Sequence, residues 1–226
     1  MPGIAERLGE IRTRIAEACR FAGRDPAEVQ LLAVSKTFPT SCIKEAFEEG
    51  QTDFGESRQQ EAAEKFADLP DGICWHFIGK IQRNKVRKIL ADFGVLHSVD
   101  SMKLARHIDR IAGEEGCRPE VFVEVNLADE SSKGGFDPGE LREAMDELSG
   151  FGNLKLQGLM VIPPFESGAE SVRPWFVKAR ELRDELQQQS GVPLPELSMG
   201  MSGDFEVAIE EGSNIVRVGS AIFGQR

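Results

Sequence analysis

Several residue types that support enzyme chemistry are rare or missing in this chain. Its 226 residues include no tyrosine, only three histidines and only four cysteines. No phenol is therefore available as an acid or base. The cysteines are far apart, with no CxxC pair and no histidine at a spacing typical of metal ligands. We interpret all four as free thiols and expect no metal site; they are Cys19, Cys42, Cys74 and Cys117.

Long apolar runs and excess positive charge are also missing. No stretch of 18 apolar residues could span a bilayer, and the charged, amphipathic first 20 residues lack the apolar centre of a signal peptide. A net charge of −11 is unsuited to binding a polyphosphate. Residues 80–88 carry five basic side chains, but Ile81, Val86 and Ile89 recur among them at helical spacing, which favours a solvated helix face. We therefore expect a cytoplasmic protein that binds neither membranes nor nucleic acid.

Strand-like and helix-like segments alternate along the whole chain. Short runs rich in β-branched and apolar residues predict eight strands, at 31–35, 52–55, 74–78, 95–99, 121–126, 156–160, 196–199 and 215–218. Amphipathic patterns predict helices at 3–21, 43–49, 58–66, 81–90, 102–112, 138–148, 172–189 and 204–210, with a short turn at 220–224.

This alternation indicates an α/β protein with a parallel sheet. Eight βα units in a chain of this length favour a (β/α)8 TIM barrel with an extra N-terminal helix, formed as one domain over residues 1–226. An open doubly wound sheet is the alternative. In a barrel, the active-site residues lie where the strands end. We therefore expect one mouth to be surrounded by Lys36, 55–57, 76–79, 98–100, Asn126, 160–163, 198–202 and 217–220.

The ends of the first, seventh and eighth predicted strands carry the most informative residues. Lys36 follows the first, Ser202 follows the seventh, and Arg217 lies in the eighth, directly before Val218-Gly219-Ser220. In barrels, the loops after strands seven and eight commonly bind a phosphate through backbone N–H groups. Gly219 allows a close approach, and both serines can donate a hydroxyl.

A lysine close to another cation has a lowered pKa and becomes a nucleophile toward carbonyls. Together with a phosphate cup and an arginine, this combination suggests pyridoxal 5′-phosphate (PLP) held as a Schiff base, with Arg217 keeping the pyridine nitrogen unprotonated. Two plainer interpretations stay open. Lys36 could simply point into water at the end of a strand, and Arg217 could form a buried ion pair with Glu210 or Glu211.

At this point the sequence resembles the pyridoxal phosphate homeostasis proteins, relatives of the N-terminal barrel domain of bacterial alanine racemase. The stretches that carry the resemblance span nearly the whole chain in order. They are LLAVSKTFP, FGES followed by QE, WHFIGKIQRNK, HSVDS, VNLADESSKGG, LQGLMVIPP and LSMGMSGDFEVAIEEGSNIVRVGSAIFG.

The resemblance implies roles for individual residues. Lys36 matches the Schiff-base lysine, and Arg217 matches the arginine that faces the pyridine nitrogen. Phosphate-binding positions match Ser202, Gly219 and Ser220, while Ser198 and Met199 would line the side of the cofactor and His76 and Phe77 would be wall residues. The family commonly has asparagine where this chain has Ser57, so a cofactor contact through the Ser57 hydroxyl is carried over only by analogy.

The missing tyrosine bears on the reaction that the resemblance suggests. Alanine racemase uses a tyrosine from a second domain as the base opposite its lysine, and this chain has neither tyrosine nor sequence beyond Arg226. We interpret the three histidines, His76, His97 and His107, as structural or surface residues. The sequence therefore predicts a non-enzymatic PLP-binding protein for intracellular storage, buffering or delivery of PLP.

Other hypotheses remain at this stage. One is a weak racemase or lyase that acts on a small amino acid through Lys36, and another is a phosphate-ligand binder without PLP. We expect a monomer, with PLP-dependent apoenzymes as the acceptors of any delivered cofactor. Lys133, in a glycine-rich loop, is either an exposed lysine or part of a secondary site at which PLP is handed on.

Overall fold

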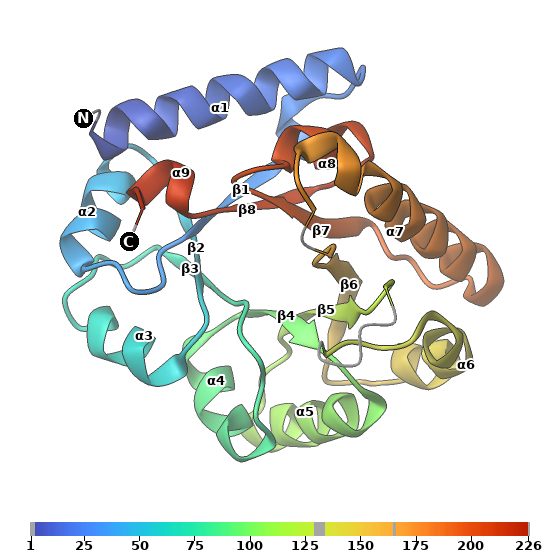
Figure 1. The fold of residues 1–226 in the computed structure, drawn as a ribbon. Coiled ribbons are helices and arrows are strands. Elements are labelled where there is room, and N and C mark those ends of the chain that lie inside the picture. Colours follow the sequence, from blue (N-terminus) through green and yellow to red (C-terminus); the bar gives the residue numbers. More distant parts are fainter. Residues whose placement is uncertain (1–2, 129–133, 165, 226) are drawn as a thin grey trace.

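Eight parallel strands close into a barrel in the computed structural model, which describes residues 3–128, 134–164 and 166–225 (Figure 1). Each strand pairs with the next one in sequence, and β8 pairs back with β1, so that Leu32 lies opposite Arg217. The strands are β1 (Gln30–Val34), β2 (Asp53–Glu56), β3 (Cys74–Phe77), β4 (Val95–Val99), β5 (Glu120–Val125), β6 (Lys155–Val161), β7 (Glu196–Met201) and β8 (Ile215–Val218). The predicted TIM barrel is confirmed.

Helices surround the barrel, as Figure 1 shows. They are α1 (Ile4–Phe21), α2 (Thr40–Glu48), α3 (Gln59–Phe66), α4 (Val86–Asp92), α5 (Met102–Glu115), α6 (Pro138–Ser149), α7 (Ala169–Ser190), α8 (Phe205–Glu210) and α9 (Ser220–Phe223), with 3-10 turns η1 (Pro26–Glu28) and η2 (Arg83–Lys85). Leu8, Ile11 and Ile15 recur on one face of α1 and are buried. This face packs α1 against α8 and α9, outside the ring of βα units.

The helix predicted at 81–90 is wrong at its start. Gln82 is extended, a 3-10 turn follows it, and α4 begins only at Val86. Ile81, Val86 and Ile89 are buried while Arg87 is exposed, so the basic segment presents its charges to solvent as expected. None of the helices in the described ranges is long and apolar enough to cross a bilayer.

Buried apolar side chains form three clusters. Two large clusters lie between the barrel strands and the surrounding helices, and a third, smaller one comprises Leu32, Val95, Phe122, Met160 and Ile215. Side chains alternate along a strand, so every second residue of β1 and β8 faces the barrel interior. The interior also holds polar groups, since the ring of Phe122 stacks on that of His97 with 4.6 Å between their centroids.

Candidate functional site

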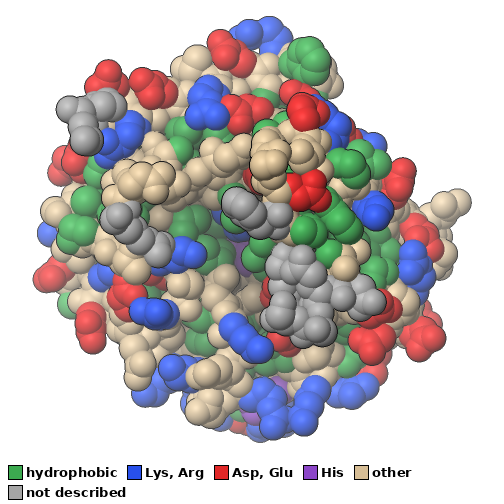
Figure 2. Space-filling model, viewed as in Figure 1, with side chains coloured by type: hydrophobic (Ala, Val, Ile, Leu, Met, Phe, Trp, Pro, Cys, Tyr) green, Lys and Arg blue, Asp and Glu red, His purple; other side chains and the backbone are tan. Residues whose placement is uncertain are grey.

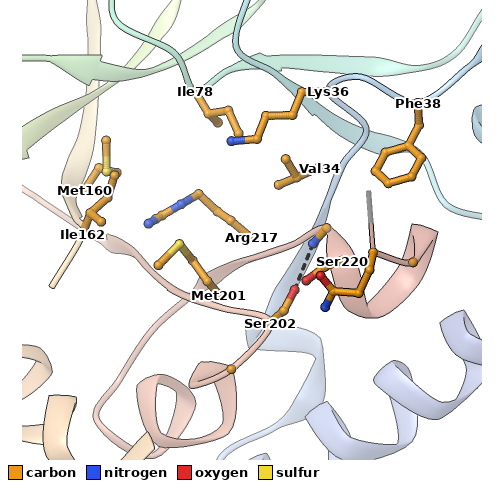
Figure 3. A pocket seen from close by; sticks show the side chains of 14 residues that line it. Val34, Lys36, Phe38, Ile78, Met160, Ile162, Met201, Ser202, Arg217 and Ser220 are labelled. Atoms are coloured by element: carbon orange, nitrogen blue, oxygen red, sulfur yellow. Dashed lines mark hydrogen bonds between the residues drawn. The ribbon is translucent and has the colours of Figure 1, made fainter. Parts of the chain in front are cut away.

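A pocket of about 520 Å³ opens where β1, β6, β7 and β8 end (Figure 3). Figure 2 shows a hollow near the centre of this face, with hydrophobic side chains on its walls. The lining residues are Val34, Lys36, Phe38, Ile78, Met160, Ile162, Met201, Ser202, Gly203, Arg217, Gly219, Ser220, Gly224 and Gln225. The pocket therefore lies at the end of the barrel where active sites of this fold are found.

Lys36 projects into this pocket from a tight turn after β1. In Figure 3 its ammonium group and the guanidinium of Arg217 extend into the same space. The backbone N–H of Phe38 donates to the carbonyl of Ser35 at 3.0 Å, which closes the turn. Thr37 has a left-handed conformation, φ 69°, and its N–H donates to Oε1 of Glu61 at 2.6 Å. These contacts fix the backbone that carries the lysine.

A buried ion pair stabilises the same turn through a hydrogen bond to its first residue, Ser35. Nζ of Lys65, on α3, lies 2.9 Å from Oε1 of Glu56 and 3.3 Å from the carbonyl oxygen of Ser35. The Ser35 hydroxyl donates to the same Glu56 oxygen at 2.7 Å. Burial raises the pKa of Glu56, although the bonds from Lys65 and Ser35 oppose the shift. The end of β1, the end of β2 and α3 are thus connected next to Lys36.

Arg217 is buried, and its hydrogen bonds go to neutral groups. Nη1 donates to the carbonyl oxygen of Ser198 at 2.7 Å and to the Ser198 hydroxyl at 2.9 Å, while Nη2 donates to the carbonyl of Val161 at 3.0 Å. Burial lowers the pKa of Arg217 to about 10, against the attraction of Asp204 and Glu124. The guanidinium is therefore held in one orientation by the backbone of β6 and β7.

The alternative role for Arg217, an ion pair with Glu210 or Glu211, is wrong. Both glutamates bind Arg173 on α7 instead, at 2.6 and 2.7 Å. Arg217 points into the barrel, whereas α8 and its C-terminal end lie outside the strands.

A line of polar side chains continues from Arg217 through the barrel interior. Oγ of Ser198 lies 2.9 Å from Nδ1 of His97, and Nε2 of His97 lies 3.0 Å from Nδ1 of His76. Nε2 of His76 then lies 3.3 Å from Oδ1 of Asp53, the first residue of β2. Burial, together with His76 and Arg217, lowers the pKa of His97 well below its ordinary value, so its ring is neutral. We call Arg217, Ser198, His97, His76 and Asp53 the polar column.

The loops after β7 and β8 meet at the pocket through Ser202. Its hydroxyl oxygen accepts from the N–H of Gly219 at 3.2 Å, drawn as a dashed line in Figure 3, and from the N–H of Ala221 at 3.4 Å. A Cβ at position 219 would lie 3.2 Å from the carbonyl oxygen of Val34, so glycine allows β8 to run close to β1 here. Hydroxyl and N–H groups thus converge on one side of the pocket.

The structure brings five of the eight predicted cofactor-binding residues together on the lining: Lys36, Ser202, Arg217, Gly219 and Ser220. The remaining three do not lie on this lining. Ser198 lies behind Arg217 as its hydrogen-bond partner, and Met199, the next residue along β7, points the opposite way into the outer core. Ser57 lines a separate groove with Gln60 and Lys80.

Four apolar residues of the lining lie in segments that the sequence placed at the barrel mouth: Ile78, Met160, Ile162 and Met201. Two others, Val34 and Phe38, were not predicted. Val34 could have been found by counting back two residues from Lys36 along the strand. His76 and Phe77 were expected as wall residues but do not line this pocket. His76 belongs to the polar column, and Phe77 lies in the outer core. Lys133 lies outside the described residues.

One prediction about the cysteines is also wrong. Cys74 does have a histidine within ligand distance, because its Sγ lies 3.5 Å from Nε2 of His76. Residues two apart on a strand share a face, and β3 begins Cys74-Trp75-His76.

The family model described as "Alanine racemase, N-terminal domain" matches residues 7–226. Proteins named "Pyridoxal phosphate homeostasis protein" are 46% identical in Aquifex aeolicus, over 98% of this chain and 97% of that protein, and 43% identical in Pseudomonas aeruginosa, over 100% and 97%.

Among solved structures, PipY from Synechococcus elongatus with PLP bound is 44% identical over 98% of this chain and 100% of that one, with a TM-score of 0.88. Alanine racemase from Clostridium difficile has a TM-score of 0.73 at 16% identity, over 95% of this chain and 55% of that one. The racemase comparison shows the shared fold.

Proposed function

We propose that this chain, which belongs to the family of pyridoxal phosphate homeostasis proteins within the wider alanine racemase N-terminal domain family, holds PLP in the pocket between Lys36 and Arg217. Its role is to store, buffer or deliver the cofactor in the cell, without catalysing a reaction of its own. The names of the relatives, which give a homeostasis role, and the relative with PLP bound support this function.

The residues of the pocket fit PLP at three places. An apolar wall that includes Val34, Ile78 and Met160 suits a pyridine ring. The hydroxyls of Ser202 and Ser220 suit a phosphate, and the N–H of Gly219 positions the Ser202 hydroxyl by donating to its oxygen. Bound PLP supplies an aldehyde, which a lysine amine takes up as a Schiff base. We assign that amine to Lys36.

Arg217 determines what such a site can do. Its guanidinium carries only donors and is fixed by two backbone carbonyls, so it keeps a facing pyridine nitrogen unprotonated. An unprotonated ring stabilises negative charge at a substrate carbon poorly. The arginine therefore favours retention of the cofactor over turnover.

One observation on the pocket lining favours a carrier over an enzyme. Of the described residues that line the pocket, only Lys36 and Arg217 have titratable side chains, and Arg217 is occupied with carbonyl oxygens. Racemisation by two bases needs a second proton-transfer group opposite the lysine. The lining offers none among these residues, which supports a carrier over the alternative of a weak racemase or lyase.

The binding proposal is tested by spectroscopy and mass mapping. The purified protein should be yellow, and borohydride should fix one PLP on the peptide that contains Lys36. Lys36→Ala should abolish this adduct, whereas Lys44→Ala, which removes an exposed lysine from α2, should leave it intact. A colourless protein that does not change on PLP addition, or a full adduct on another lysine in Lys36→Ala, would contradict the assignment.

The carrier proposal has its own test. Amino acids incubated with the PLP-loaded protein in deuterated water should exchange their Cα proton no faster than with free PLP. Sustained exchange at enzymatic rates would refute the carrier role while leaving the binding site intact.

A further inference from the structure

We propose that Asp53, Cys74 and His76 form a binding site for a zinc-type divalent cation at the end of the barrel opposite the pocket. Asp53 and Cys74 are the first residues of β2 and β3, and the register pairs them directly. His76 is two residues further along β3. The pocket, in contrast, lies where the strands end, so the two sites are separated by the length of the barrel interior.

The distances between the three ligand atoms match a tetrahedral zinc site. Zinc binds thiolate sulfur at about 2.3 Å and nitrogen or oxygen at about 2.0–2.1 Å, so tetrahedral angles place sulfur and nitrogen about 3.5 Å apart and nitrogen and oxygen about 3.3 Å apart. In this protein Sγ of Cys74 is 3.5 Å from Nε2 of His76, and that nitrogen is 3.3 Å from Oδ1 of Asp53. All three atoms lie within 4.8 Å of one another.

The same geometry argues against a nucleophile relay. In a Cys-His-Asp hydrolase, the thiol and the carboxylate bind opposite nitrogens of the imidazole. Here Cys74 and Asp53 both face Nε2 of His76. Convergence of a thiol, an imidazole nitrogen and a carboxylate oxygen on one small volume fits a shared cation.

The far side of the His76 ring is fixed as in metal-binding histidines. A ligand histidine usually forms a hydrogen bond through its other nitrogen, which sets its ring orientation. Nδ1 of His76 lies 3.0 Å from Nε2 of His97, which is fully buried and in turn contacts Ser198 at 2.9 Å. The imidazole therefore presents Nε2 to Asp53 and Cys74 before any ion arrives.

The surrounding charges and the exposure suit a cation from solvent. Glu120 and Glu196, the first residues of β5 and β7, interact electrostatically with His76 and add negative charge to that of Asp53. The nearby cation Lys155 pairs with Glu120 at 2.7 Å. Cys74 is exposed, so an ion can enter and keep water as its fourth ligand.

The ligand set indicates which cation binds. Thiolate and imidazole ligands favour zinc and related transition metals, whereas Mg²⁺ and Ca²⁺ prefer oxygen ligands. On binding, the Cys74 thiol loses its proton to solvent and the sulfur donates an electron pair to the metal. No electron is transferred in this step.

Cobalt titration of the full-length protein, treated with chelator and then freed of it, tests the proposal. Co²⁺ should bind at one equivalent with a thiolate-to-cobalt charge-transfer band and the visible spectrum of a tetrahedral ion, and Zn²⁺ should displace it. Cys74→Ser should abolish the band and weaken zinc binding more than about 100-fold, beyond the usual effect of losing an outer-shell partner. Asp53→Asn should also weaken binding.

Cys117→Ser is the matched control, because it removes a partly exposed thiol that packs against the outer apolar core and is not one of the three proposed ligands. It should bind Co²⁺ like the unchanged protein. Absence of stoichiometric binding, a spectrum without thiolate charge transfer, or a Cys74→Ser variant that binds zinc as tightly as the control would each overturn the proposal. Circular dichroism of each variant separates a lost ligand from a lost fold.

Discussion

Replacing Lys65 by methionine should destabilise the protein in a way that depends on pH. Methionine keeps the length of the side chain but removes the ammonium that lies 2.9 Å from Oε1 of Glu56. Glu56 is fully buried, and its other oxygen, Oε2, has no hydrogen-bond partner among the described residues. The substitution therefore leaves a buried carboxylate whose strongest remaining contact is the Ser35 hydroxyl at 2.7 Å.

The magnitude follows from the cost of an uncompensated buried charge. Breaking a buried ion pair from one side costs about 3–5 kcal/mol. The Ser35 bond survives, so we expect the lower end, about 3 kcal/mol of unfolding free energy. For a chain of this size that corresponds to a fall in melting temperature of about 6–12 °C.

The sign of the pH dependence is fixed by the direction of the Glu56 pKa shift. Burial already raises this pKa in the folded protein, and loss of Lys65 raises it further. The folded state then binds the Glu56 proton more tightly than the unfolded chain does. Stability of Lys65→Met therefore rises as the pH falls from above the raised pKa toward the ordinary pKa of glutamate, and it is lowest when the carboxylate is charged.

Urea unfolding at about pH 7.5 and about pH 5.5 measures both effects. The double variant Lys65→Met, Glu56→Gln should regain most of the loss, because it removes the buried charge. Lys103→Met, at an exposed position of α5, should unfold like the unchanged protein. A deficit below about 1 kcal/mol, an equal deficit at both pH values, or a double variant no better than the single one would refute the reasoning.

Two further predictions concern the sheet and the pocket. Gly158→Ala would place a methyl group against the carbonyl oxygen of Glu196 on the next strand, so it should cost about 3 kcal/mol in urea unfolding. Gly152→Ala, with open space around its Cβ, should be tolerated, and equal stability of the two variants would contradict the β6–β7 register. Ser202→Ala removes the hydroxyl that accepts from Gly219 and should weaken PLP binding about tenfold in an absorbance titration. Unchanged affinity would place the phosphate elsewhere.

The strand count could be predicted because each strand is a short apolar run between amphipathic helices. Lys36 and Arg217 could be predicted to lie near each other, because the parallel strands of a barrel all end at one mouth. The side of a strand that each residue faces was predicted less well than the place of the strand in the fold. Ser198 and Met199 are neighbours in β7 and cannot face the same side, yet both were expected on the lining.

Contacts between strands account for what the sequence could not predict. The cluster around His76 needs Asp53 from β2, which is 23 residues away in the chain, and pairing register is not encoded in any local pattern. Likewise, no spacing rule indicates that Arg217 bonds to the carbonyls of Val161 and Ser198. Such contacts follow only once the barrel closes.

The hydrogen bonds of the polar column all run in one direction through the barrel interior. Arg217 can only donate at one end and the Asp53 carboxylate can only accept at the other. We assign the hydrogens accordingly: the Ser198 hydroxyl donates to His97, His97 donates from Nε2 to His76, and His76 donates from Nε2 to Asp53.

A cation on Nε2 of His76 would displace that last hydrogen and move the ring proton to Nδ1. His97 would then donate from Nδ1 to Ser198, whereas the bond from Arg217 to Ser198 would keep its direction, because a guanidinium only donates. A cation at one end of the barrel would thereby change the hydrogen positions as far as Ser198, the hydrogen-bond partner of Arg217. The tautomer of His97 would therefore report whether a cation is bound at His76, and imidazole ¹⁵N shifts can read it directly.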